Sequence, residues 1–274
     1  MCYNYIYVNT RGIIMEQHSK EVEKLIKLAN KSGDYSKVES MLNEDISILK
    51  NANTICSFDM EFSDRDGKTI TEIAFSIHSK INGKTFSEHL IIEEQLGQYT
   101  RRNTPVEHSE MYAYGQSKVI SLKEGVKMLN RAIKSADASI LYIPHHKQKH
   151  FEEHGFDDIE FSSLQDMLKL QKRQSNALSL SQAVDFFCQV EQPTNNAGND
   201  AVATLEILSK NFGKEIGLEN FYLEATNDYS NDPRKKSGVE IRESRRTMRK
   251  QDKIADKAKQ EVSESKVKKP RTLL

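Results

Sequence analysis

Long apolar runs and paired cysteines are both absent from this sequence. No apolar run approaches the ~20 residues that a membrane-spanning helix needs, and residues 1–15 lack the charged start and long apolar centre of a secretory signal peptide. The three cysteines, Cys2, Cys56 and Cys188, include no close pair that would form a metal knuckle or a disulfide framework. We therefore expect an intracellular protein, cytoplasmic or nuclear, that is neither secreted nor bound to a membrane. Met1 and Met15 both remain open as the true start.

An overall excess of charge is also lacking, because 40 Lys and Arg balance 40 Asp and Glu. The balance hides an asymmetry: residues 233–274 contain 15 Lys or Arg and 6 Asp or Glu, a net charge of +9, so the preceding chain carries −9. This basic segment has few large apolar residues, which predicts disorder or a solitary charged helix. We divide the chain into an N-terminal helical extension (1–51), a folded domain (52–213) and a basic tail (214–274).

The extension is predicted to form two amphipathic helices that serve packing more than chemistry. Apolar residues recur at helical spacing from Val22 to Ala29, and Gly33 follows as a stop. Ser36 and Glu39 have the spacing of a capping box for the second helix.

The folded domain is predicted to be α/β, with a mixed sheet and flanking helices. Three short strands joined by tight turns, at 55–62, 68–77 and 84–94, indicate an antiparallel opening. Ser121 caps a helix that runs to Ala136, and 138–143 reads as a buried strand. Further helices are expected at 147–154, 163–173, 179–190 and 199–211.

Asp59 and Glu61 are the first candidates for chemistry. They are two residues apart in a predicted strand, so both carboxylates point to one face, within an apolar segment that includes Phe58 and Phe62. Two buried like charges are costly unless a cation bridges them, and hard ions such as Mg²⁺ or Mn²⁺ prefer carboxylate oxygen. For the Asp-x-Glu pattern alone, the competing interpretation is a pair of carboxylates at an exposed strand end.

The context of this pair resembles the opening of DnaQ-like DEDD 3′–5′ exonucleases, which have a ribonuclease H-like fold. Asp59 and Glu61 stand as motif I, and Ile70–Ala74 is similar to the family's second strand. Asn195–Ala201, which reads N-N-A-G-N-D-A, resembles motif III, most closely that of a fungal exonuclease-like group whose motif reads HNAGNDA. Glu107–Ser117 is also similar to that group. The resemblance implies a phosphodiester hydrolase in which Asp59, Glu61 and Asp200 are catalytic and hold two Mg²⁺ or Mn²⁺ ions.

Parts of the family pattern are missing. The motif III His, the family's general base, is replaced by Asn195, which cannot accept a proton at neutral pH. Pro144–Phe151 contains no Asp where motif II expects one, and Ser162-Ser163 replaces a supporting Asp-Thr pair. His145, His146 and His150 occupy the motif II region, either as substitute bases or metal ligands, or as solvated histidines at the start of a drifted helix.

Two hypotheses follow: a 3′–5′ exonuclease acting on single-stranded RNA or DNA, or an inactive pseudo-exonuclease that binds nucleic acid or a protein partner. Basic residues that would contact phosphates are Arg101 and Arg102, and in the tail Arg245, Arg246, Arg249 and Lys250. A solvated tail without nucleic acid is the competing interpretation. The sequence leaves the oligomeric state open.

Overall fold

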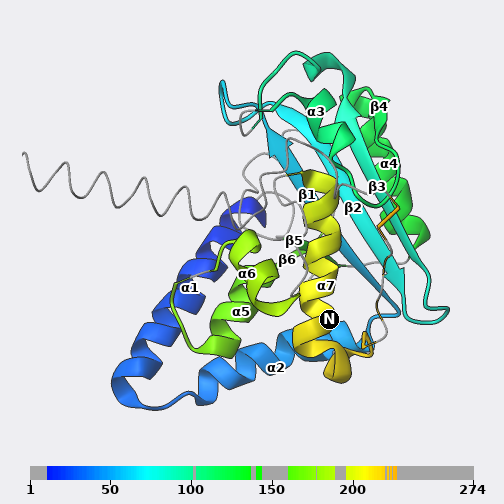
Figure 1. Ribbon diagram of the computed structural model, residues 1–274. Helices are drawn as coiled ribbons and strands as arrows, with labels where there is room; N and C mark the ends of the chain where they lie inside the picture. Colours follow the sequence, from blue (N-terminus) through cyan, green and yellow to red (C-terminus); the bar gives the residue numbers. More distant parts are fainter. Residues whose placement is uncertain are drawn as a thin grey trace, which may run out of the picture. The chain divides into compact units, whose positions relative to one another are not determined.

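The computed structural model describes residues 11–100, 103–136, 140–143, 160–176, 178–188 and 196–219, and the single residues 221, 223, 225 and 226. Within these residues, the strands form a six-stranded mixed sheet in the order β4-β3-β2-β1-β5-β6 (Figure 1). The pairs β1–β2 and β2–β3 are antiparallel, and the remaining pairs are parallel. The predicted α/β architecture with a mixed sheet and flanking helices is confirmed.

The strands span β1 (Thr54–Phe62), β2 (Ile70–Ser79), β3 (Thr85–Ile92), β4 (Lys118–Ile120), β5 (Ile140–Ile143) and β6 (Glu160–Ser163). The first two hairpin turns need glycine, because Gly67 and Gly83 have φ of 63° and 66°, in the left-handed region. Asp66 holds the first turn by accepting from Thr69 Oγ1 and from two backbone N–H groups. These bonds, that of the Thr69 side chain foremost, lower the pKa of Asp66 to about 2.

The two N-terminal helices, α1 (Arg11–Ser32) and α2 (Ser36–Asn51), form where the apolar spacing predicts them. Their buried residues Val22, Ile26 and Val38 pack with Leu170 of α5 (Leu164–Lys172). The predicted capping box is wrong, because the cap residue of α2 is Tyr35 and it makes no side-chain cap bond. Instead, Ser36 donates its backbone N–H to Asp34 Oδ1 at 2.9 Å, which lowers the pKa of Asp34. Asp34 thus accepts from the backbone N–H of Ser36, which in a capping box would donate to the side chain of Glu39.

The sheet has two chemically different faces. Alternate residues of β1, β2 and β3, such as Phe58, Ile73 and Leu90, form an apolar core with Leu129 of α4 (Leu122–Ser135). The other face carries buried polar side chains and lies under α7 (Ala197–Ile216). Its polar residues include Ser57, Asp59, Glu61, Glu72, Ser76 and His89. Because strand side chains alternate between faces, each strand serves the core and a polar layer at once.

The remaining helices complete the layer on the side of α7. A second apolar core joins α5, α6 (Leu180–Phe187) and α7 to Leu49 of α2 and Ile55 of β1. Three short elements were not predicted, and all lie in the stretch between β3 and α4: the 3-10 helix η1 (Glu93–Gln95), α3 (Pro105–Glu110) and β4. The helix expected at 147–154 lies outside the described residues. Among the described helices, none combines the length and apolarity that crossing a membrane requires.

Candidate metal centre

Strand β1 presents Asp59 and Glu61 to the face under α7, as the strand alternation predicts. On the same face, Ser57 Oγ donates to the backbone oxygen of Ala201 in α7 at 2.6 Å. Asp59 and Glu61 are 5% and 1% exposed. Both carboxylates therefore lie between the sheet and the first turns of α7.

Helix α7 supplies the third carboxylate, Asp200, which is 3% exposed. The helix approaches the sheet closely because the contact is made by three alanines, Ala74, Ala197 and Ala201, all fully buried. One carboxylate oxygen from each of Asp59, Glu61 and Asp200 lies within 4.8 Å of the other two. The structure thus brings together the three acidic residues that the family resemblance implied would share one site.

This donor set fits Mg²⁺ or Mn²⁺. It offers only carboxylate oxygens, which these hard cations prefer, and no thiolate that would select a softer metal. Three carboxylates gathered in a buried position repel one another, and a divalent cation between them offsets that repulsion. Asp59, Glu61 and Asp200 are the described residues that would hold it.

A fourth buried carboxylate, Glu72, lies beside the cluster, but its two oxygens are hydrogen-bonded to histidines and to a backbone N–H group. Glu72 is the registered partner of Glu61 across β1 and β2. Its Oε1 bonds to His108 Nδ1, and its Oε2 accepts from His89 Nε2 at 3.0 Å and from the backbone N–H of Ala197 at 3.2 Å. Burial alone would raise the pKa of Glu72, but the hydrogen bonds from His108 and His89 outweigh burial and lower the pKa to about 2.

His89 links Glu72 to the segment that follows α3. Its Nδ1 lies 2.8 Å from Ser117 Oγ, which in turn lies 3.1 Å from the backbone oxygen of Ser109. Its Nε2 donates to Oε2 of Glu72, because an ionised carboxylate can only accept. His89 and Glu72 therefore form a buried hydrogen-bonded pair next to the acidic cluster.

The residues before Asp200 dock the segment 108–113 onto the start of α7. Asn196 caps α7 and donates Nδ2 to the backbone oxygen of His108 at 2.6 Å. Asn199 donates to the oxygen of Met111 and accepts from the N–H of Ala113, both at 2.9 Å. The N-A-G-N-D-A string therefore encodes a clamp as well as an acidic ligand.

Gly198 completes this clamp. A Cβ at this position would lie 2.5 Å from a ring carbon of Tyr112, and the Tyr112 hydroxyl donates to Ser87 Oγ on β3 at 2.8 Å. Such a contact is far below the van der Waals distance, so only glycine allows the ring to lie over the helix start.

Sequence reasoning missed His89 and His108 as site residues, although the resemblance included Glu107–Ser117, the segment that carries His108. One signal for that segment was present: Thr104-Pro105-Val106-Glu107 forms a full capping box with Pro at the first helical position, and it starts α3. The pairing of Glu72 with residues 17 and 36 positions away has no local signature.

Several predicted site residues lie outside the described residues. These are His145, His146, His150, Asn195, Arg101, Arg102, Arg245, Arg246, Arg249 and Lys250. Their suggested roles stay predictions.

Comparison with known families agrees with the geometry. Residues 54–211 match the DEDDh family described as "DNA polymerase III subunit epsilon-like, C-terminal domain". The match begins with β1 and ends within α7, so it includes all three residues of the acidic cluster. No curated protein matched the chain.

Proposed function

The chain belongs to the DEDDh family of DNA polymerase III subunit epsilon-like domains, and on that premise we propose that it is a divalent-metal-dependent 3′–5′ exonuclease acting on single-stranded RNA or DNA. The observation that carries the proposal is the buried cluster of Asp59, Glu61 and Asp200. Three carboxylates in a buried position have a desolvation cost that a purely structural domain need not bear.

In this proposal Asp59, Glu61 and Asp200 bind Mg²⁺ or Mn²⁺, two ions in an active enzyme. Bound ions of this kind activate a water molecule and stabilise the leaving oxygen of a phosphodiester. The protein's own contribution is to hold the carboxylates rigidly: Asp59 and Glu61 on a central strand, and Asp200 on a helix whose first turn is anchored by Glu72.

The proposed enzyme is slow, because general-base catalysis typically contributes about 10²–10⁴-fold and Asn195 cannot supply it. His145, His146 and His150 are our candidates for a substitute base. We also propose kinship with the fungal exonuclease-like group, which rests on the N-A-G-N-D-A string.

The alternative is a pseudo-exonuclease that binds nucleic acid or a protein partner without cutting. Asn195 and the missing motif II Asp favour it, since a site that no longer cleaves is free to lose both residues. Either form would act inside the cell, where Cys56 and Cys188, both buried and free, stay reduced.

The deciding experiment is degradation of 5′-labelled single-stranded RNA and DNA with Mn²⁺ or Mg²⁺ by wild type and by Asp59→Ala. A ladder that shortens from the 3′ end with wild type and is absent with Asp59→Ala supports the exonuclease. Asn195→His should then raise the rate, by up to about 10²–10⁴-fold if no other base substitutes. Absence of cleavage by wild type and by Asn195→His, with strand binding retained, would establish the pseudo-exonuclease.

A further inference from the structure

Helix α1 carries a regular row of lysines on the face opposite its packing face. Lys20, Lys24, Lys27 and Lys31 are exposed and spaced by four, three and four residues, whereas Val22 and Ile26 are fully buried. At about 1.5 Å per residue the row is about 16 Å long. We call these four lysines the α1 lysine row.

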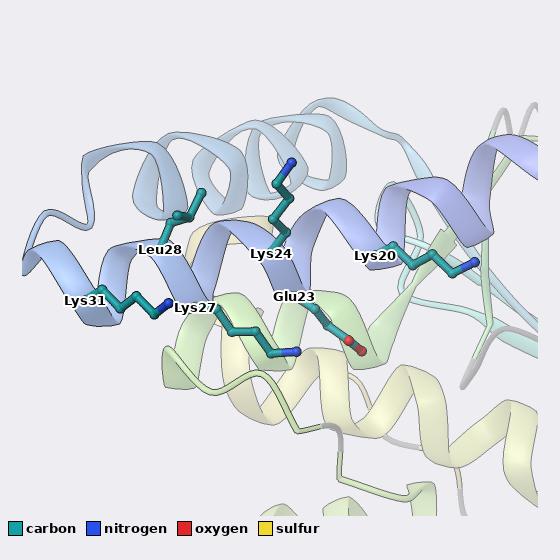
Figure 2. A pocket seen from close by; sticks show the side chains of 6 residues that line it. All are labelled: Lys20, Glu23, Lys24, Lys27, Leu28 and Lys31. Atoms are coloured by element: carbon teal, nitrogen blue, oxygen red, sulfur yellow. The ribbon is translucent and has the colours of Figure 1, made fainter.

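The row lines a shallow hollow with net positive charge. The hollow has a volume of about 350 Å³ and is lined by the four lysines with Glu23 and Leu28. Figure 2 shows these six side chains, all of them projecting from α1. Glu23 is the one acidic residue of this lining. Its Oε1 lies 3.0 Å from Nζ of Lys169 on α5, so the lysine charge offsets the charge of Glu23. Leu28 is 54% exposed and adds apolar surface. The hollow therefore suits an anionic chain with some apolar groups.

The row begins at the edge of the sheet where the acidic cluster lies. Ser19, next to Lys20, donates to Asp166 in the first turn of α5, and Glu23 bonds to Lys169 one turn later, so α1 runs parallel to α5. Helix α5 starts directly after β6, which is parallel to β5 and β1, and Asp59 and Glu61 lie in the C-terminal half of β1. Figure 1 shows the first turns of α1 and α7 toward the same end of the fold.

The separation suits a single strand that continues beyond the cluster. Two strand-to-strand steps of about 4.8 Å and one helix-to-helix step of about 8–10 Å amount to about 20 Å. At about 3.4 Å per stacked nucleotide, a strand with its 3′ end at Asp59 reaches Lys20 after about 6 nucleotides.

Helix α4 offers a contrasting surface of similar charge. Lys123, Lys127 and Lys134 are exposed on it. Because α4 covers the apolar face of the sheet, its lysines lie on the side away from Asp59 and Asp200. They are the matched control for the α1 lysine row.

We infer that the α1 lysine row binds the phosphate backbone of the single strand whose 3′ end lies at the acidic cluster. This inference rests on the proposed function and extends it to residues outside the family match, which starts at residue 54. Lysine contacts to phosphates carry no sequence information, so the row would lengthen the binding site without choosing a sequence. An acidic polypeptide is the competing partner. It has no phosphodiester for the proposed metal centre to act on, so nothing would place its end at the acidic cluster.

The test measures strand binding against salt in full-length proteins. Every protein carries Asp59→Asn so that binding is followed without cleavage. The first variant adds Lys24→Gln, Lys27→Gln and Lys31→Gln, and the control adds Lys123→Gln, Lys127→Gln and Lys134→Gln. The probe is a labelled oligo(dT) or oligo(U) of about 20 nucleotides, titrated between about 50 and 200 mM salt, with polyglutamate of equal charge as a second probe.

The slope of log K against log salt is negative, and each lost phosphate contact makes it less steep by about 0.7 for single strands. The slope of the α1 variant should therefore be less negative than the parent's by about 2. Its affinity at about 50 mM salt should fall by at least about 10-fold, while the α4 control keeps the parent's slope.

An α1 variant that binds like the α4 control overturns the inference and leaves the proposed function standing if wild type still cuts the strand. Polyglutamate binding as tight as strand binding, and equally sensitive to the α1 changes, overturns it in favour of an acidic protein partner. Failure of every protein to bind the strand, together with no cleavage by wild type, removes the proposed function as well.

Discussion

Glu72 accepts a hydrogen bond at 3.2 Å from the backbone N–H of Ala197, three residues before Asp200. Glu72 lies on β2, beside Glu61 in the register, so this bond ties the helix that carries one ligand to the strands that carry the other two. The anchor is charged at neutral pH because hydrogen bonds from His108 and His89 outweigh burial and hold the pKa of Glu72 at about 2. Position and charge make Glu72 a positioning residue for the proposed metal centre.

Glu72→Gln is expected to weaken Mn²⁺ binding by about 10–100-fold, the usual effect of removing a partner that orients metal ligands. Isothermal titration of Mn²⁺ into the full-length protein measures it. Glu88→Gln is the matched control, since Glu88 is also a buried carboxylate with a cationic partner, Lys118, but it pairs with Phe75 and belongs to the apolar face. Equal Mn²⁺ affinity in both variants would show that Glu72 has no part in positioning.

Gly198→Ala is expected to destabilise the protein by about 1–3 kcal/mol, because the new Cβ would meet the ring of Tyr112 at 2.5 Å. For a domain of this size that lowers the thermal midpoint by about 2–4 °C per kcal/mol. Gly97→Ala serves as the control, since nothing lies within 4 Å of a Cβ there. A midpoint for Gly198→Ala no lower than that of Gly97→Ala would mean that Tyr112 moves aside freely.

Asp200→Asn should have opposite effects with and without metal. In a chelator it removes one of three crowded negative charges and raises the thermal midpoint. With Mn²⁺ at about 100 times its dissociation constant, wild type gains about 2.7 kcal/mol and the variant gains little. Scanning calorimetry with a chelator and with Mn²⁺ compares the two. A wild-type midpoint that does not respond to Mn²⁺ would count against a metal centre.

Asp45 should make stability fall as pH rises from about 4 to about 7. Its pKa is raised from 3.8 to about 7 by burial, and further by the charges of Glu44 and Asp166. In this window the unfolded chain releases the proton while the folded chain keeps it, so the folded state loses relative stability until the folded pKa is passed.

Asp45→Asn removes this contribution and should raise the thermal midpoint at about pH 8 relative to wild type, by about 2–4 °C for each kcal/mol gained. At about pH 4 the two proteins should differ little from one another. Midpoints that differ by the same amount at both pH values would assign the effect to packing instead of ionisation.

Local rules predicted the parts of the site that depend on a single element. The strand alternation placed Asp59 and Glu61 on one face, and the structure confirms it. Their proximity to Asp200, 139 or more positions away in the chain, came from the family resemblance alone. Strand periodicity sets which face a side chain occupies, but the close approach of α7 depends on the contact of its Ala197 and Ala201 with Ala74 of β2.

The polar layer under α7 could not be predicted in the same way. Read in isolation, His89 and His108 look like ordinary polar residues, and only their distance from Glu72 gives them a role. The failed capping box at Ser36 has a local cause, because Asp34 is two residues away and binds the same N–H. Rules based on residue spacing predict neither a nearby side chain that takes over a backbone N–H nor a hydrogen bond between residues far apart in the chain.

The buried ammonium of Lys169 has a practical consequence for anyone preparing a fragment of this protein. It is 4% exposed and bonds to Ser19, Glu23 and Asp166, so two of these three partners lie on α1, outside the family match. A fragment trimmed to residues 54–211 would leave this charge, and the apolar strip of α5 around Leu170, facing water. Such a fragment should aggregate on expression, whereas one that starts at or before residue 11 keeps the covering helix and should stay dispersed.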